Sequence, residues 1–129
     1  MVAVDTNVVV RLLTNDHAAQ VARAVALFRR GPVFVPKSVL VETEWVLRYS
    51  YEIPVQSIVR AFLALMGLDS VTIEDAPAVH QAIGLMAKGI DFADALHLAS
   101  SASADRFATF DAKLIKRARG IAPLAVVPV

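Results

Sequence analysis

The chain has 129 residues, no cysteine and a net charge of +1. The absence of cysteine excludes disulfides and thiol chemistry and fits the reducing cytoplasm, where we expect the protein to act. No apolar run reaches the roughly 18 residues that span a bilayer, because arginines interrupt every candidate, and the first residues lack the basic region of a secretory signal. The even composition predicts a single domain over residues 1–129.

Short apolar runs alternate with helical periodicity along the first half of the chain. The predicted elements there are a strand over 1–4 that ends at Asp5, a helix capped by Thr6 that ends at 15–16, a helix over 17–30, a strand over 33–35, a helix over 41–51 with Ser38 as its cap, and a helix over 54–66. Gly31-Pro32 breaks the second of these helices. We expect the large aromatic residues Trp45 and Phe62 to lie in the core.

The same alternation continues in the second half. The predicted elements are a strand over 71–73, a helix over 76–88, a helix over 91–103, a strand over 106–110, a short basic helix over 112–119 and a last strand over 124–127. Strands that alternate with helices indicate the α/β class, with a central, mainly parallel sheet and helices on both faces.

Four acidic residues stand inside or beside strongly apolar segments: Asp5, Glu42, Asp94 and Asp111. A carboxylate in such a place is costly unless it is paired or bound to a cation. Asp5 and Asp111 follow strands, and the carboxyl ends of parallel strands are where sites form in open α/β sheets. We therefore expect the four carboxylates to converge and to bind Mg²⁺ or Mn²⁺, hard cations that prefer oxygen ligands.

Some of these acids also have a simpler structural interpretation. Asp5 could be a helix cap, and so could Asp91, which shares a helix face with Asp94 at the i, i+3 spacing. Glu42 could be an acid favoured by the helix dipole, a role open to Glu44 as well; we prefer Glu42 for the site because the helical spacing places it on the apolar side. His97 continues the Asp91–Asp94 stripe, and a partly buried position against the sheet explains it better than metal ligation.

A basic run near the end of the chain contains Lys113, Lys116, Arg117 and Arg119. A solvated helix face and an RNA-binding patch are both open interpretations of it.

Four motifs in order give the chain a resemblance to a known family. They are V-D-T-N-V-V-V-R-L-L at 4–13, V-L-V-E-T-E-W-V-L-R at 39–48, D-F-A-D-A-L-H-L-A at 91–99 and T-F-D-A-K-L at 109–114. The chain resembles the PIN-domain family over essentially its whole length, and within it the VapC-type toxins of toxin–antitoxin pairs. The resemblance implies a single PIN-like domain and a metal-dependent endoribonuclease. It places the acidic metal-site positions on Asp5, Glu42, Asp94 and Asp111, with Thr6 or Asn7 and Thr109 as polar helpers.

The corresponding mechanism is hydrolysis of an RNA phosphodiester. Three aspartates, Asp5, Asp94 and Asp111, would hold one ion, while Glu42 would bind a second ion or act as a base on the attacking water. A cognate antitoxin protein and a second copy of the chain in a homodimer are the expected protein partners, and no membrane is expected. The alternatives are phosphoryl transfer through Asp5, which the missing second acid of a D-x-D pattern disfavours, and a non-catalytic binding module.

Overall fold

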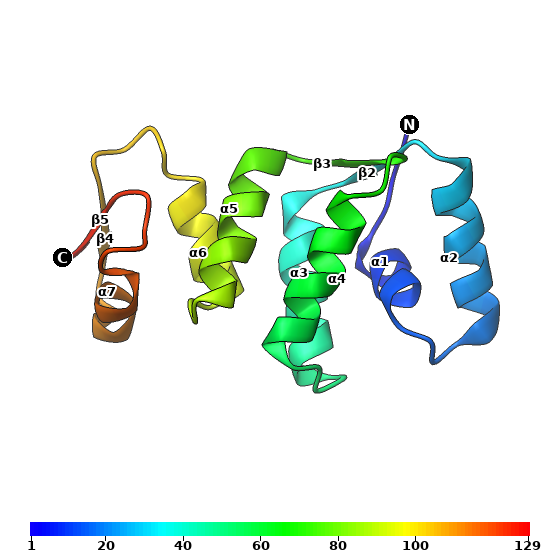
Figure 1. The fold of residues 1–129 in the computed structure, drawn as a ribbon, viewed down its shortest axis with the longest axis horizontal. Helices are drawn as coiled ribbons and strands as arrows, with labels where there is room; N and C mark the ends of the chain where they lie inside the picture. Colours follow the sequence, from blue (N-terminus) through cyan, green and yellow to red (C-terminus); the bar gives the residue numbers. More distant parts are fainter. The chain divides into compact units, whose positions relative to one another are not determined.

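The computed structural model describes residues 1–129, which form seven helices and five strands (Figure 1). The chain divides into two compact units, Met1–Ala76 and Pro77–Val129. The first unit contains β1 (Val2–Ala3), α1 (Thr6–Leu13), α2 (Ala18–Arg30), β2 (Val33–Val35), α3 (Lys37–Tyr49), α4 (Val55–Met66) and β3 (Val71–Ile73). The second contains almost all of α5 (Ala76–Ala87), then α6 (Phe92–Ala99), β4 (Arg106–Thr109), α7 (Ala112–Ala118) and β5 (Ala125–Pro128).

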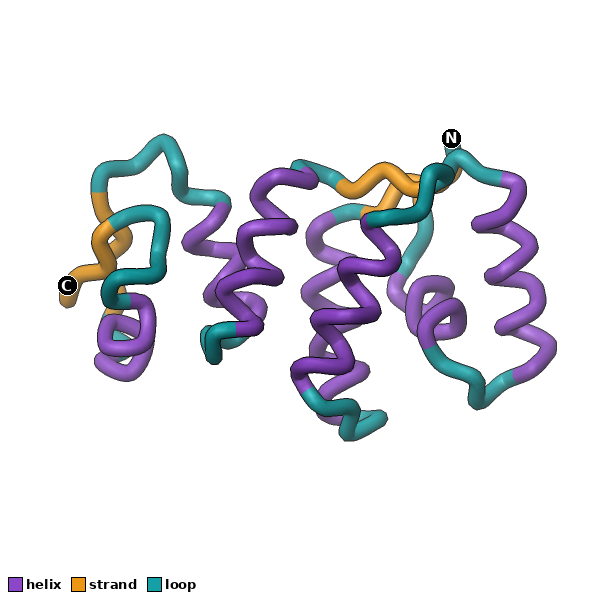
Figure 2. The backbone as a smooth tube through the Cα atoms, viewed as in Figure 1, coloured by secondary structure: helices purple, strands orange, loops and turns teal.

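A three-stranded parallel sheet organises the first unit, in the order β1-β2-β3. Val33 of the central strand pairs with Val2 on one side and with Val71 on the other. Parallel neighbours require a crossover between them, and the two helical pairs α1–α2 and α3–α4 provide these connections (Figure 2). Val33 and Val35 are completely buried, so the central strand lies in the core of this unit.

The helices of the first unit pack in sequence. Helix α1 contacts α2 and α3, and α4 contacts α3 and β3. Their apolar faces supply fully buried side chains, among them Val9, Leu40, Leu47, Ile58 and Phe62. Burying side chains of this size is worth about 1.5–3 kcal/mol each, which makes this packing the main stabilising contribution in the unit.

One glycine closes the turn between α2 and β2. Gly31 has a positive φ of 33°, and a Cβ placed on it would lie 2.7 Å from the Cβ of Ser70. Two residues later, the Val33 N–H donates to the Ser70 carbonyl at 2.7 Å. The chain therefore enters β2 through a space that accommodates only a hydrogen atom on the glycine Cα.

A two-stranded parallel sheet, β4 with β5, organises the second unit. Helix α7 connects the two strands and packs against both. Helices α5 and α6 bury continuous apolar faces that include Val79, Ile83, Phe92 and Leu98.

The α/β class with parallel strands is confirmed, and the ladders are distributed over two sheets. The single-domain expectation stays a prediction. Phe62 is buried as expected, but Trp45 is 56% exposed, so its assignment to the core was wrong. Its ring instead contacts that of Tyr49 one turn away in a tilted arrangement, with ring centroids 5.3 Å apart. None of the helices combines the length and the apolar character needed to cross a membrane.

Several predicted boundaries moved for identifiable reasons. Helix α3 begins at Lys37, four residues earlier than expected, and its N-cap is Pro36 instead of Ser38. The Lys37 N–H donates to the Glu74 carboxylate at 2.8 Å, and this contact from a distant segment satisfies a free donor of the first turn. Helix α6 ends at Ala99, before the serine-rich turn that the expected helix over 91–103 had included.

Candidate functional site

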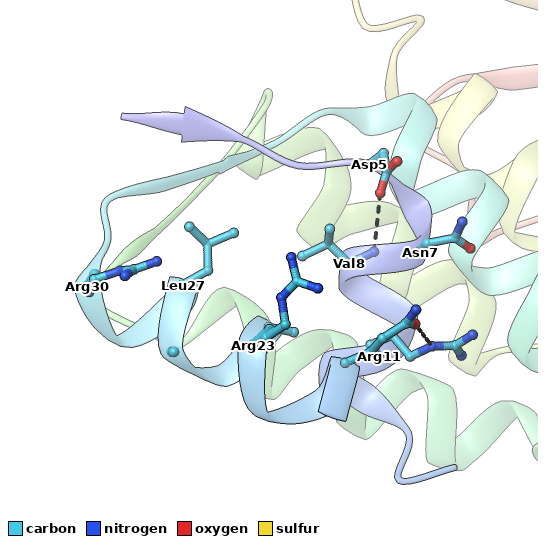
Figure 3. Close-up of a pocket in the computed structure, with 10 residues that line it drawn as sticks. Asp5, Asn7, Val8, Arg11, Arg23, Leu27 and Arg30 are labelled. Carbon is cyan, nitrogen blue, oxygen red and sulfur yellow. Dashed lines mark hydrogen bonds between the residues drawn. The ribbon is translucent and has the colours of Figure 1, made fainter. Parts of the chain in front are cut away.

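Asp5 lies where the chain leaves β1 and enters α1, and it is the N-cap of that helix. Its Oδ1 accepts a hydrogen bond from the backbone N–H of Val8 at 3.2 Å, and its other oxygen accepts none (Figure 3). The expectation that Thr6 caps the helix was wrong, because Thr6 is the first residue of α1 and is buried. The structural interpretation of Asp5 therefore holds, and it leaves one carboxylate oxygen available.

Asp111 repeats this arrangement in the second unit, between β4 and α7. Its Oδ1 accepts hydrogen bonds from the backbone N–H groups of Lys113 at 2.9 Å and Leu114 at 3.2 Å. The backbone N–H of Asp111 itself donates to the Thr109 hydroxyl at 3.0 Å, so Thr109 positions the aspartate. Backbone donors at a helix start fix the orientation of a carboxylate, here with Oδ2 making no hydrogen bond.

Asp94 lies in the first turn of α6 and is only partly exposed. Its pKa is raised above the ordinary value, first by partial burial and then by the negative charges of Asp91 and Asp111, while His97 acts in the opposite direction. Asp91 and Asp111 therefore each lie within electrostatic reach of Asp94 in the second unit. Crowded carboxylates of this kind repel each other unless a proton or a cation neutralises them.

Asp91 occupies the N-cap position of α6, as expected, but its side chain makes no capping hydrogen bond. The capping role assigned to this side chain was therefore wrong. His97 is exposed, which also contradicts the expectation of a partly buried position. Its side chain lies one turn beyond Asp94, consistent with its effect on the pKa of that group.

The two glutamates of α3 have exchanged the environments expected of them. Glu42 is exposed, whereas Glu44 is 3% exposed. Glu44 forms an ion pair with Arg48, with Oε1 at 3.0 Å from Nε, and this pairing makes its burial possible. The buried face of the helix consists of Leu40, Thr43, Glu44 and Leu47. The apolar placement predicted for Glu42 was therefore wrong, although its candidacy for the site stays open.

Asp5 and Glu42 belong to the first unit, and Asp94 and Asp111 belong to the second. Within neither unit are three histidine, aspartate or glutamate side chains grouped closely enough to hold a metal ion. The convergence of all four carboxylates stays a prediction from the sequence.

A pocket of about 660 Å³ lies between α1 and α2 in the first unit. Asp5 and Asn7 line it together with three arginines, Arg11, Arg23 and Arg30 (Figure 3). Arg23 and Arg30 were not identified from the sequence. Their i, i+7 spacing on one helix face, around Leu27, is the signal that could have identified them.

The fold and these residues define an α/β protein with carboxylates at its strand-to-helix turns. The PIN domain family matches residues 2–120, and the chain belongs to that family. No curated protein matches the chain. PIN domains are generally nucleases and typically use divalent metal ions, so the chain has a nuclease-type fold.

Proposed function

We propose that this PIN domain is a metal-dependent endoribonuclease that hydrolyses RNA phosphodiester bonds in the cytoplasm. Its acidic residues are Asp5, Glu42, Asp94 and Asp111, and its ion is Mg²⁺ or Mn²⁺. The observation that supports this most directly is the raised pKa of the partly buried Asp94, which comes first from that burial and then from the nearby charges of Asp91 and Asp111. A partly buried carboxylate with two further carboxylates in electrostatic reach suits a divalent cation.

The donor set fits a hard cation in its chemistry. Asp5 and Asp111 each use Oδ1 for a helix cap and keep Oδ2 without a hydrogen bond. Their orientation is set by backbone donors before any ligand binds, which reduces the entropy lost on binding. Asp94 adds a partly buried oxygen ligand. A bound divalent cation would lower the pKa of a water molecule and neutralise charge on the phosphate.

The remaining roles belong to residues of the chain. Glu42 is exposed, and one of its carboxylate oxygens accepts a proton of the attacking water as the water oxygen bonds to phosphorus. The bond from phosphorus to the leaving ribose oxygen breaks, and that oxygen takes a proton from solvent. Asn7 is exposed beside Asp5 and donates to a phosphate oxygen through its amide. Thr109 keeps Asp111 in place through the hydrogen bond to its backbone N–H.

The test is cleavage of a structured RNA by the purified protein in Mg²⁺ or Mn²⁺, with and without EDTA. We expect cleavage that stops with EDTA and is lost in Asp94→Asn. Asp105→Asn is the matched control, because Asp105 is an exposed acid of the same unit outside the proposed set. Undiminished cleavage in EDTA would contradict the proposal, as would equal loss of activity in the control.

We further propose that the protein is the toxin of a type II toxin–antitoxin pair and acts as a homodimer. The order and spacing of the four motifs, through their resemblance to VapC-type toxins, support the toxin role. Expression of the wild type alone should arrest growth, Asp94→Asn should not, and a small protein encoded next to it should relieve the arrest. Normal growth at high expression of an active enzyme would reject the toxin role and leave the nuclease proposal intact.

A further inference from the structure

The pocket between α1 and α2 carries more positive than negative charge. Three arginines and a single carboxylate, Asp5, line it together with Asn7, Gln20 and apolar side chains. Its volume of about 660 Å³ is in the range of about 300–1,000 Å³ that is usual for ligand sites. All of its residues belong to the first unit, so this site is defined within one compact body.

One of the three arginines is already committed to the protein. Arg11 donates from Nε to Gln20 at 2.6 Å and from Nη1 to the Tyr51 hydroxyl at 2.9 Å, and it pairs with Asp16 at 3.4 Å. These contacts connect α1 with the start of α2 and with the turn that follows α3. Arg11 is therefore held in place in the wall of the pocket, and only its Nη2 donors remain for a ligand.

The other two arginines have the opposite character. Arg23 and Arg30 are exposed, and neither makes a hydrogen bond or an ion pair. In Figure 3 the Arg23 side chain extends from α2 toward Val8 of α1. The i, i+7 spacing places the two Cα atoms about 10.5 Å apart along the helix axis, on one face, with Leu27 between them.

We propose that this pocket binds the backbone of a single-stranded segment of the RNA substrate, with Arg23 and Arg30 on phosphates. The assignment rests on the proposed nuclease function. Both arginines lie on one face of α2, so both can contact phosphates of the same strand. Planar guanidinium groups bind phosphate oxygens in pairs, which favours arginine in this role.

Two further features favour RNA over an acidic protein segment. Between the arginines the wall is apolar, with Val8, Ala24 and Leu27, and this surface suits sugars and base faces. Asp5, one of the proposed acidic residues, lines the same pocket. A strand held by Arg23 and Arg30 would therefore lie beside that carboxylate.

The test is binding of a fluorescent single-stranded RNA in EDTA, followed by anisotropy over a series of salt concentrations. EDTA separates binding from cleavage. Each phosphate contact on a single strand contributes about 0.7 to the slope of log affinity against log salt. Arg23→Ala with Arg30→Ala should reduce the magnitude of that slope by about 1.4 and weaken binding roughly ten-fold or more at low salt.

The matched control is Arg29→Ala with Arg60→Ala, which removes the same charge from exposed positions of the same unit outside the pocket. This control variant should keep most of the slope of log affinity against log salt. Arg23→Lys with Arg30→Lys retains the charge and should also keep the slope, which separates a lost phosphate contact from a misfolded variant.

If the wild type cleaves RNA and the Arg23→Ala/Arg30→Ala variant has the same slope of log affinity against log salt, the pocket assignment is overturned and the nuclease proposal stands. An unchanged RNA slope combined with lost binding of an acidic partner protein would make this a protein-docking surface, which also overturns it. A wild type that neither binds nor cleaves RNA overturns both proposals.

Discussion

The Asp5 carboxylate accepts the backbone N–H of Val8 at 3.2 Å, so a residue proposed for the active site also begins helix α1. The same group thus has a structural role and a proposed chemical role. Because the two roles need different atoms of the carboxylate, suitable substitutions can separate them.

Asp5→Asn should abolish cleavage and preserve the fold, since asparagine caps a helix about as well as aspartate. Asp5→Ala should abolish cleavage as well and lose about 0.5–2 kcal/mol of unfolding free energy with the cap. Denaturant unfolding of both variants without metal, together with a cleavage assay, checks this. An Asp5→Asn variant as unstable as Asp5→Ala would show that the negative charge itself supports the helix.

The two glutamates of α3 should separate activity from stability. Glu42→Gln should lose cleavage with little change in unfolding free energy, because Glu42 is exposed. Glu44→Gln leaves Arg48 without its charge partner. We expect a loss of about 1–3 kcal/mol, below the value for a fully buried pair, because the Arg48 side chain is 26% exposed. Melting curves and cleavage rates for both variants test this, and a stable but inactive Glu44→Gln would reverse the assignment.

Asp94 should make the stability of the metal-free protein depend on pH. Because its pKa is raised in the folded state, folding stability falls as pH rises from the ordinary value of 3.8 through the raised folded value. Asp94→Asn removes this loss. The variant should therefore unfold at a higher temperature than the wild type near neutral pH, and the difference should vanish below the ordinary value. A lower melting temperature at neutral pH would contradict the raised pKa.

Asp91→Asn provides the companion measurement. Removing the charge of Asp91 should lower the pKa of Asp94, while much of the activity remains. An NMR titration of the Asp94 carboxyl carbon measures this pKa. Since the Asp91 side chain makes no capping hydrogen bond, the loss of a cap is not expected. If Asp91→Asn were inactive and Asp94→Asn active, the metal ligand would be Asp91.

The ionisation of Asp16 tests the contacts that hold Arg11 in place. The Tyr51 hydroxyl donates to Asp16 at 2.7 Å, and this bond, with contributions from Thr14 and Arg11, lowers the pKa of Asp16. Tyr51→Phe should raise that pKa toward the ordinary value, measured by NMR titration. A lowered pKa contributes stability above the ordinary value that is lost as pH falls through the folded pKa. The variant should therefore lose less stability on acidification than the wild type does.

The sequence predicted most of the elements because their signals are local. Alternating apolar runs, Gly31-Pro32 and the acids at strand ends mark the strands and the turns that follow them. Asp5 and Asp111 were found at those turns, in the places the pattern indicated.

What the sequence could not supply depends on contacts between distant residues. Helix α3 starts early because Glu74 satisfies the Lys37 N–H. The environments of Glu42 and Glu44 were exchanged because an ion pair with Arg48 permits a buried carboxylate, which helical spacing cannot indicate. The arginines of α2 line one pocket with Asp5 because α2 packs beside α1, and this packing is not visible in the sequence.

Gly31 imposes a constraint that no chemistry of the site would suggest. With a positive φ and Ser70 only 2.7 Å from where a Cβ would stand, even alanine at position 31 would press on the loop before β3. The cost would appear as a shifted pairing between β2 and β3, and through β2 it would reach β1, the strand that leads to Asp5. A survey of random substitutions should thus find position 31 among the least tolerant in the chain, although glycine has no side chain that could take part in the chemistry.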